Sequence, residues 1–271
     1  MINATTTICC VLGDPVEQSK SPVMHNAAYK ELGHNYSFVA FKPTSIKHAV
    51  EAIRTLGIRG AAVTIPFKEK LIEYVDQVDE TALEIGAANT IVNDEGILTA
   101  YNTDWIGAMT ALRQKTIIAG KKVAVLGAGG AARAIVYGLV KEQASEIHVY
   151  NRTHTDAELL VRKFGLTQAH TLDDLSLLKN TDIIINTTPV GMYPHAGNSA
   201  IPASALENHH SVFDIVYNPK ETQLLKDAKK AGATVVYGYT MLLHGGATQF
   251  ELFTREKPPI EVMEKALLTS V

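Results

Sequence analysis

The chain has 271 residues, of which 46% are hydrophobic and 20% charged, and its formal net charge is -3. This composition predicts a globular protein with a sizeable core, built as one large domain or two smaller ones. The charge balance offers no basic field for nucleic acid or an anionic membrane, so it favours a small-molecule partner and leaves both a monomer and a homodimer open.

No apolar stretch reaches the roughly 20 residues needed to span a bilayer, and the first residues lack the basic-then-apolar layout of a signal peptide. The two cysteines, Cys9 and Cys10, are neighbours in a β-rich run. Neighbouring side chains of a strand point to opposite faces, so we expect free thiols in a core strand. These features together predict a cytoplasmic protein.

The first hundred residues alternate short β-rich runs with helical patterns, which predicts an α/β domain. The expected strands cover residues 6–12, 36–41, 61–65 and 90–92. The expected helices cover residues 23–32, 46–56 and 67–75. A helix over residues 105–113 is expected to link this domain to the next one.

A glycine-rich loop with the sequence GAGGAARA follows an apolar run at residues 123–126 and opens a helical pattern. Gly127, Gly129 and Ala132 fill the G-x-G-x-x-G/A fingerprint, in which backbone approaches a pyrophosphate and a helix N-terminus faces it. The motif alone also fits an ordinary turn before a surface helix. A second strand at residues 146–150 supplies βαβ spacing, which favours dinucleotide binding.

Strand signals continue after the loop with helical patterns between them, as expected for a doubly wound parallel sheet. They cover residues 147–150, 182–186, 212–216 and 234–237, with helical patterns at 131–140 and 224–231. Terminal helices at 241–253 and 260–268 are expected to return to the first domain. The predicted division is residues 1–104 for the first α/β domain, 105–238 for a Rossmann-like domain and 239–271 for the C-terminal helices.

Polar residues follow the expected strands of the first domain, where open α/β sheets place ligand-binding loops. Ser19 and Ser21 follow the first strand, and Ser21 before Pro22 also fits a helix N-cap. Lys68 is expected in the first turn of a helix beginning near Pro66. The helix dipole disfavours an ammonium group there by about 0.3–1 kcal/mol, so a functional role explains this lysine better than a solvated surface position.

Asn89 and Asp104 add an amide and a carboxylate beside two further strand edges. Asp104 also fits as the cap of the linking helix, which would be worth roughly 1 kcal/mol. Capping and catalysis do not exclude each other, so both interpretations stand for this residue.

Short motifs recur along the chain in a fixed order. The first domain carries S-x-S-P-x-x-H-N at 19–26, V-T-x-P-x-K at 63–68, A-x-N-T at 87–90 and N-T-D-x-x-G at 102–107. The rest carries GAGGAARA at 127–134, N-R-T at 151–153, N-x-T-P-x-G-M at 186–192, D-x-x-Y-N-P at 214–219 and F-E-L-F at 250–253. In this series the chain resembles the shikimate dehydrogenase family over nearly its whole length.

The resemblance implies NADPH-dependent, reversible reduction of 3-dehydroshikimate to shikimate in aromatic amino acid (chorismate) biosynthesis. It implies Lys68 as general acid and base, coupled to Asp104, which would hold the lysine and a substrate hydroxyl. This fits the chemistry, because hydride addition to a ketone creates an alkoxide that needs a proton. The implied substrate-binding residues are Ser19 and Ser21 for the carboxylate, Thr64 and Asn89 for ring hydroxyls, and Tyr217.

The implied cofactor site combines the glycine loop with the ends of neighbouring strands. Arg152 stands at a strand end where an NADP site places an arginine for the 2′-phosphate, which favours NADP over NAD. Asp156 stands where the family often has a second basic residue, so the strictness of this preference is open. The implied cofactor-binding residues are Gly127, Ala128, Gly129, Gly130, Ala131, Asn151, Arg152, Thr153, Thr187, Thr188, Ile215, Gly238 and Met241.

A second departure is Gly245, where the family commonly has a substrate-binding glutamine. Gln249, one helical turn later on the same face, could partly substitute as a substrate-binding residue, and a solvated or core-edge glutamine fits equally well. Alternatives are therefore a quinate/shikimate dehydrogenase of relaxed substrate and cofactor choice, a non-catalytic NADP-binding regulator, or another two-domain dehydrogenase, such as one acting on folates. No metal is expected, since no H-x-x-x-H or C-x-x-C pattern occurs.

Overall fold

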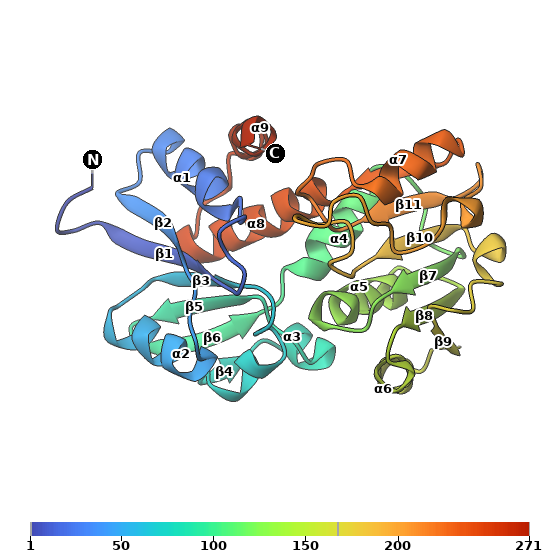
Figure 1. Cartoon of the computed structure of the whole chain (residues 1–271). Helices are drawn as coiled ribbons and strands as arrows, with labels where there is room; N and C mark the ends of the chain where they lie inside the picture. Colours follow the sequence, from blue (N-terminus) through green and yellow to red (C-terminus); the bar gives the residue numbers. More distant parts are fainter. Residues whose placement is uncertain (1, 167, 271) are drawn as a thin grey trace. The chain divides into compact units, whose positions relative to one another are not determined.

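The computed structural model describes residues 2–166 and 168–270 and divides into two compact units (Figure 1). The first unit runs through Asp104 and resumes at Leu243, and the second runs from Trp105 to Leu242. Helix α4 (Asp104–Arg113) begins at the first boundary, and helix α8 (Gly238–Thr254) spans the second. Each unit has its own six-stranded sheet, so the prediction of a two-domain α/β chain is confirmed.

The first unit is built on a mixed sheet. Its strands are β1 (Thr7–Leu12), β2 (Tyr36–Phe41), β3 (Gly60–Val63), β4 (Gln77–Val78), β5 (Thr90–Asp94) and β6 (Ile97–Tyr101), in the order β2-β1-β3-β5-β6-β4. Its helices are α1 (Ser21–Glu31), α2 (Ile46–Thr55), α3 (Glu80–Ile85) and α9 (Ile260–Ser270), with the 3-10 helix η1 (Lys70–Glu73). β1 runs parallel to β2 and β3, whereas β5 runs antiparallel to β3 and β6. Helix α1 packs against α9, which brings the C-terminal helices onto this unit.

The helix expected over residues 67–75 does not form, and that prediction is wrong. Residues 65–69 make turns and only η1 follows them. The reason is a contact with a segment distant in sequence. The carbonyl of Lys68 accepts a hydrogen bond from Ala88 N at 2.9 Å, so it is not available for a hydrogen bond within a local helix. The helix-dipole argument for Lys68 therefore does not hold.

The remaining predicted elements are present, with ends that differ by three residues or fewer. β4, β6 and α3 have no counterpart among the predicted elements. β5 and β6 form a hairpin whose turn places Glu95 at φ 53° and Gly96 at φ 92°. Such turns usually begin with Asn or Asp before the glycine, so the Glu-Gly pair gave only a weak signal.

The second unit is built on an entirely parallel sheet. Its strands are β7 (Lys122–Leu126), β8 (Glu146–Asn151), β9 (Gln168–Thr171), β10 (Ile183–Asn186), β11 (Ser211–Asp214) and β12 (Thr234–Tyr237), in the order β12-β11-β10-β7-β8-β9. Its other elements are α5 (Gly130–Lys141), α6 (His154–Phe164), α7 (Gln223–Lys230), η2 (Leu178–Asn180) and η3 (Ala203–Ala205). This is the Rossmann strand order, which confirms the predicted fold of this half.

Apolar side chains cover both faces of the parallel sheet. On one face, Ile135 and Leu139 of α5 pack with Val123 and Val125 of β7. On the other face, Leu224 of α7 belongs to a second cluster with neighbouring strands. The strand order reverses between β7 and β10, and ligands of such sheets bind beyond the carboxyl ends of the strands at this point.

Cys9 and Cys10 lie in β1 as buried free thiols, as the sequence predicted. Burial raises the pKa of the Cys9 thiol to about 11, which keeps it protonated and unreactive at neutral pH. Across the part of the chain that the structure describes, no helix is long and apolar enough to cross a membrane.

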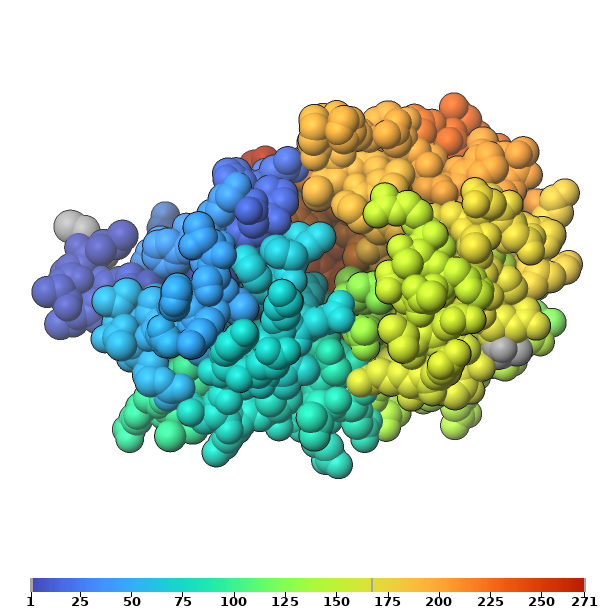
Figure 2. Space-filling model, turned by 60° about the horizontal axis from the view of Figure 1, so that its bottom comes forward, coloured from blue at the N-terminus to red at the C-terminus, as the bar shows by residue number. Residues whose placement is uncertain are grey.

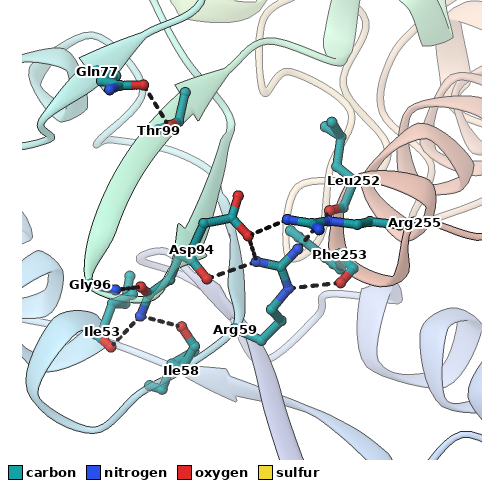
Figure 3. A network of polar contacts seen from close by, with 11 residues as sticks. Ile53, Ile58, Arg59, Gln77, Asp94, Gly96, Thr99, Leu252, Phe253 and Arg255 are labelled. Atoms are coloured by element: carbon teal, nitrogen blue, oxygen red, sulfur yellow. Dashed lines mark hydrogen bonds and ion pairs between the residues drawn. The ribbon is translucent and has the colours of Figure 1, made fainter.

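Arg59 ties the end of helix α8 to the sheet of the first unit (Figure 3). Its guanidinium donates to the carbonyl oxygens of Phe253 at 2.8 Å and Leu252 at 3.3 Å. It also donates to Asn93 O at 2.7 Å and to Asp94 Oδ1 at 2.6 Å, at the end of β5. The carbonyls at a helix C-terminus have no partner inside the helix, so a cation there satisfies them and complements the helix dipole.

Replacing Arg59 with methionine is expected to lower the free energy of unfolding by about 2 kcal/mol, because buried carbonyls lose a charged donor. Arg255→Met is the matched control, because Arg255 is exposed and also donates to Asp94. The control should cost less than about 0.5 kcal/mol, since surface ion pairs contribute little. Urea unfolding followed by circular dichroism measures both, and equal losses would contradict the role given to Arg59.

Candidate active site

A lysine and a carboxylate meet at the carboxyl end of β3. Lys68 lies in the turn after β3, and its Nζ donates to Oδ2 of Asp104 at 2.6 Å. The two side chains are only 17% and 13% exposed. Such a partly buried, hydrogen-bonded ion pair is held in a defined geometry, unlike a pair of solvated surface charges.

Asn89 fixes the other oxygen of Asp104. Its Nδ2 donates to Asp104 Oδ1 at 2.8 Å and to Thr103 Oγ1 at 3.1 Å, while its Oδ1 accepts from Thr103 N at 2.7 Å. Helix α4 begins at Asp104 itself, and Asn102 Oδ1 accepts the Asp104 N–H at 3.0 Å. The side chain of Asn102 thus satisfies the first N–H of the helix, and the carboxylate of Asp104 has Lys68 and Asn89 as partners.

The loop between β1 and α1 (residues 13–20), which carries Ser19 and is called the serine loop below, lies against the turn that carries Thr64. Asp14 N donates to Ile65 O at 3.0 Å, and a side chain at Gly13 would overlap the methyl group of Thr64. This close approach requires a glycine, and it brings the two predicted substrate-binding segments side by side.

Within the serine loop, the structure differs from the predicted cap. Ser21 is the first residue of α1 and is buried, so it is not the residue before the helix. Ser19 Oγ accepts the Ser21 N–H at 3.3 Å, so Ser19 does part of the capping. Tyr217, another predicted substrate-binding residue, follows β11 in the second unit.

Gln249 lies on helix α8 and contacts the segment of Asn89 and Thr90. Its side chain is buried, and its Nε2 donates to Thr90 Oγ1 at 2.9 Å and to Asn89 O at 3.3 Å. Gly245, one turn earlier, lies so close to β6 and α4 that an added Cβ would be 3.3 Å from Thr103 O. The amide nitrogen of Gln249 therefore binds the start of β5 and the residue before it, Asn89.

The glycine loop follows β7 at the reversal of strand order in the second unit. Gly127 has φ 111°, and a Cβ on it would overlap Thr187 Oγ1, so only glycine fits. Gly129 precedes α5, and apart from its two chain neighbours none of the described residues lies within 4 Å of the place where its Cβ would be. A phosphate at the N-terminus of α5 would therefore meet no side chain at Gly129.

A buried carboxylate, Asp214, holds the loops after β10 and β11 in place; it begins the motif at 214–219, but no role was predicted for it from the sequence. Asp214 accepts from Asn186 Nδ2 at 2.9 Å and from Thr222 Oγ1 at 2.7 Å. Burial raises the pKa of Asp214 to about 6. Asn186 Oδ1 in turn accepts from Thr188 Oγ1 at 2.7 Å, so the buried network sets the loop containing the predicted cofactor residues Thr187 and Thr188.

The other predicted cofactor residues beyond these loops lie in the same unit. Ile215 directly follows β11, and Gly238 begins α8, where a Cβ would lie 2.5 Å from Ile215 O. Met241 is buried in the first turn of α8. A glycine at position 238 therefore lets α8 start directly against the loop after β11.

The end of β8 carries Asn151, Arg152 and Thr153. Residues 152–156, which follow β8 and begin helix α6, are exposed. This part of the second unit is yellow-green in Figure 2. Asn151 Nδ2 donates to Thr153 O at 3.0 Å and to Asp156 Oδ2 at 3.4 Å. The carboxylate of Asp156 thus faces the strand end that carries Arg152. In the described ranges, no group of three or more His, Cys, Asp or Glu side chains could hold a metal ion.

Comparison with known proteins places this arrangement in a family. Three family models match: "Shikimate dehydrogenase substrate binding domain" at residues 11–91, "Shikimate / quinate 5-dehydrogenase" at 110–219 and "Shikimate 5'-dehydrogenase C-terminal domain" at 238–268. The "Shikimate dehydrogenase (NADP(+))" of Methanobrevibacter smithii is 46% identical, with 98% of each chain covered.

Solved structures agree with these matches. A crystal structure of a shikimate dehydrogenase in complex with NADP+ has a TM-score of 0.92 and 42% identity, covering 99% of this chain and 97% of that one. The shikimate 5-dehydrogenase of Thermus thermophilus, in complex with NADP(H) and shikimate, has a TM-score of 0.90 and 33% identity, covering 98% and 100%. The chain belongs to the shikimate dehydrogenase family.

Proposed function

We propose that this protein catalyses the NADP-dependent, reversible reduction of 3-dehydroshikimate to shikimate, a step of aromatic amino acid (chorismate) biosynthesis. The observation that carries the proposal is the Lys68–Asp104 pair, joined at 2.6 Å and braced by Asn89, in a chain of this family. We propose a cytoplasmic location, which agrees with two buried free thiols. A monomer and a homodimer are both compatible with this function.

Lys68 is the proton donor and acceptor of the proposed reaction. When bound, NADPH supplies the hydride to the ketone carbon. The ammonium of Lys68 then gives a proton to the oxygen that becomes the hydroxyl, and in the reverse direction its neutral amine takes that proton back. Asp104 holds Nζ through Oδ2, and Asn89 holds Asp104 through Oδ1, so the proton is delivered from a fixed point.

The substrate is proposed to bind between the serine loop and the β3 turn. The hydroxyls of Ser19 and Ser21 would take the carboxylate, and Thr64 would take a ring hydroxyl. Asn89 would bind a second ring hydroxyl in exchange for the contact of its Nδ2 with Thr103 Oγ1. Contact between the loop of Gly13 and Thr64 supports this, since it puts both segments at one sheet edge. Tyr217 is proposed as a further substrate-binding residue. Gln249 supports these residues indirectly, because its Nε2 donates to Asn89 O and Thr90 Oγ1.

The cofactor is proposed to lie with its pyrophosphate at the N-terminus of α5 and its 2′-phosphate at Arg152. The fit rests on the open space at Gly129 and the positive φ of Gly127. The proposed set is completed by Ala128, Gly130, Ala131, Asn151, Thr153, Thr187, Thr188, Ile215, Gly238 and Met241.

Replacing Asp156 with asparagine is expected to raise the ratio of kcat/KM for NADP to that for NAD about fivefold. The carboxylate faces the proposed phosphate position, and removing one like charge at close range in water is worth about 1 kcal/mol. Glu158→Gln is the matched control, because this acid of the same helix pairs with His154 and Arg162 instead. An unchanged ratio in Asp156→Asn would show that Asp156 does not affect cofactor choice.

A two-by-two assay tests the proposed function. The purified protein is given shikimate or quinate with NADP or NAD, and formation of reduced nicotinamide is followed by absorbance. We expect shikimate with NADP to give the highest kcat/KM. Equal rates in all four combinations would favour a quinate/shikimate dehydrogenase of relaxed choice, and NADP binding without turnover would favour a non-catalytic regulator.

A further inference from the structure

The orientation of the Asn89 carboxamide decides whether it can brace Asp104. A carboxamide has an acceptor end and a donor end, and only its NH2 end can hydrogen-bond a carboxylate. Asn89 Oδ1 accepts from the backbone N–H of Thr103 at 2.7 Å, and a backbone N–H can only donate. The NH2 end is thereby turned to Asp104 Oδ1, at 2.8 Å.

The hydroxyl of Thr90 supports the same orientation. Thr90 is fully buried at the start of β5, and its Oγ1 lies 2.9 Å from Asn89 Oδ1. A hydroxyl has a single proton to donate and can also accept. Since Gln249 Nε2 donates to Thr90 Oγ1 at 2.9 Å, the hydroxyl proton of Thr90 is directed to Asn89.

The hydrogen bonds consequently run in one direction, from Gln249 to Thr90, to Asn89 and to Asp104. Bonds aligned in this way polarise one another, and inside a protein they are stronger than in water. This series of hydrogen bonds ends on the carboxylate of Asp104, which holds Lys68. Each donor in the series therefore stabilises the negative charge of that carboxylate.

Helix α8 holds Gln249 at the far end of this chain. Gly246 lies against α1, where an added side chain would overlap Met24, and Gly245 lies against Thr103. Arg59 fixes the last turn of α8 through Leu252 and Phe253, and the ring of Phe253 occupies the space that a side chain at Gly60 would need. These close contacts hold α8, and with it Gln249, at a fixed position against the sheet.

We propose that Thr90 and Gln249 are positioning residues for the proton transfer. Through Asn89 they hold the carboxylate of Asp104, and thereby the Nζ of Lys68, in the geometry of the reaction. This inference rests on the proposed function, and it adds two residues that need not touch the substrate.

Thr90→Val and Thr90→Ser test the proposal, because valine keeps the shape of threonine without its hydroxyl and serine keeps the hydroxyl. For shikimate oxidation we expect Thr90→Val to lower kcat about tenfold with the KM for NADP unchanged, and Thr90→Ser to restore kcat to within about twofold of the wild type. Thr181→Val, which removes another buried threonine hydroxyl in the second unit, should leave kcat unchanged.

Gln249→Met provides a second, independent variant that removes the amide and keeps the length of the side chain. We expect a loss in kcat of about fivefold. Thr90→Val combined with Gln249→Met should be no slower than Thr90→Val alone, because both changes break one chain of hydrogen bonds. Circular dichroism confirms folding of each variant, and if Thr90→Val does not fold, Gln249→Met decides the outcome.

The inference is overturned by a folded Thr90→Val with wild-type kcat, by a Thr90→Ser as slow as Thr90→Val, or by losses that add fully in the double variant. In each of these cases the wild type remains active and the proposed function stands. A wild-type protein without shikimate-dependent reduction of NADP would instead remove the proposed function and this inference together.

Discussion

Replacing Lys68 with alanine is expected to lower kcat for shikimate oxidation about a thousandfold while the affinity for NADP stays unchanged. General acid and base catalysis by a positioned group contributes about 10²–10⁴ in rate, and Lys68 is the group whose Nζ is held by Asp104 at 2.6 Å. The affinity for NADP is expected to persist because the glycine loop lies in the other unit. Stopped-flow turnover and equilibrium binding of NADP measure the two quantities separately.

Lys70→Ala is the matched control for this variant. Lys70 is exposed, lies two residues further along the same segment and begins η1, so its loss should leave kcat within about twofold of the wild type. Asp104→Asn keeps the shape of the side chain and removes its charge, and it should also reduce kcat strongly. A Lys68→Ala enzyme with wild-type turnover would exclude this lysine from the proton transfer.

The two glycines of the cofactor loop are expected to respond differently to alanine. Gly127→Ala should lower the free energy of unfolding by about 2 kcal/mol, because φ is 111° and the new methyl group would overlap Thr187. Gly129→Ala should leave stability nearly unchanged, since no described residue other than its chain neighbours lies within 4 Å of its added Cβ. It should still weaken NADP binding at least about tenfold, which is about 1.4 kcal/mol, because that space is assigned to the pyrophosphate.

Each glycine variant is the control for the other. Thermal unfolding reports stability without cofactor, and titration with NADP reports affinity. A Gly129→Ala protein that binds NADP like the wild type would place the pyrophosphate elsewhere, whereas wild-type stability in Gly127→Ala would contradict the strain assigned to this turn.

The Rossmann half of the fold was predictable because its signals are local. Continuous apolar runs, such as Val123 to Leu126 in β7, and the glycine loop behind it specify strand, turn and helix within a short stretch of chain. The right-handedness of βαβ units then limits the strand orders that these elements can adopt. The buried network around Asp214 was not predictable, because its partners Asn186 and Thr222 come together only after the sheet has formed.

The first unit was harder to predict because distant contacts decide its local structure. The segment after Pro66 has the pattern of a helix, yet Ala88 takes the carbonyl of Lys68 and leaves a turn. That same contact sets Lys68 toward Asp104, so the error in secondary structure and the geometry of the site have one cause. Lys68 and Asp104 were identified by their motifs, but their 2.6 Å contact depends on the sheet order.

The roles of Gln249 and Thr90 could not be derived from spacing. Helical periodicity places Gln249 on the face of Gly245, but its partner is decided by how closely α8 packs on the sheet. Glycines at positions 60, 245 and 246 permit that packing, and they are recognisable as such only once their neighbours Phe253, Thr103 and Met24 are known.

The stoichiometry of a single reaction tests the central claim most directly. Purified protein is mixed with shikimate and NADP+, and the formation of NADPH is measured together with the identity of the organic product by mass spectrometry. The account predicts that NADPH and 3-dehydroshikimate form in equal amounts and that Lys68→Ala abolishes both. NADP binding with neither product formed would contradict it.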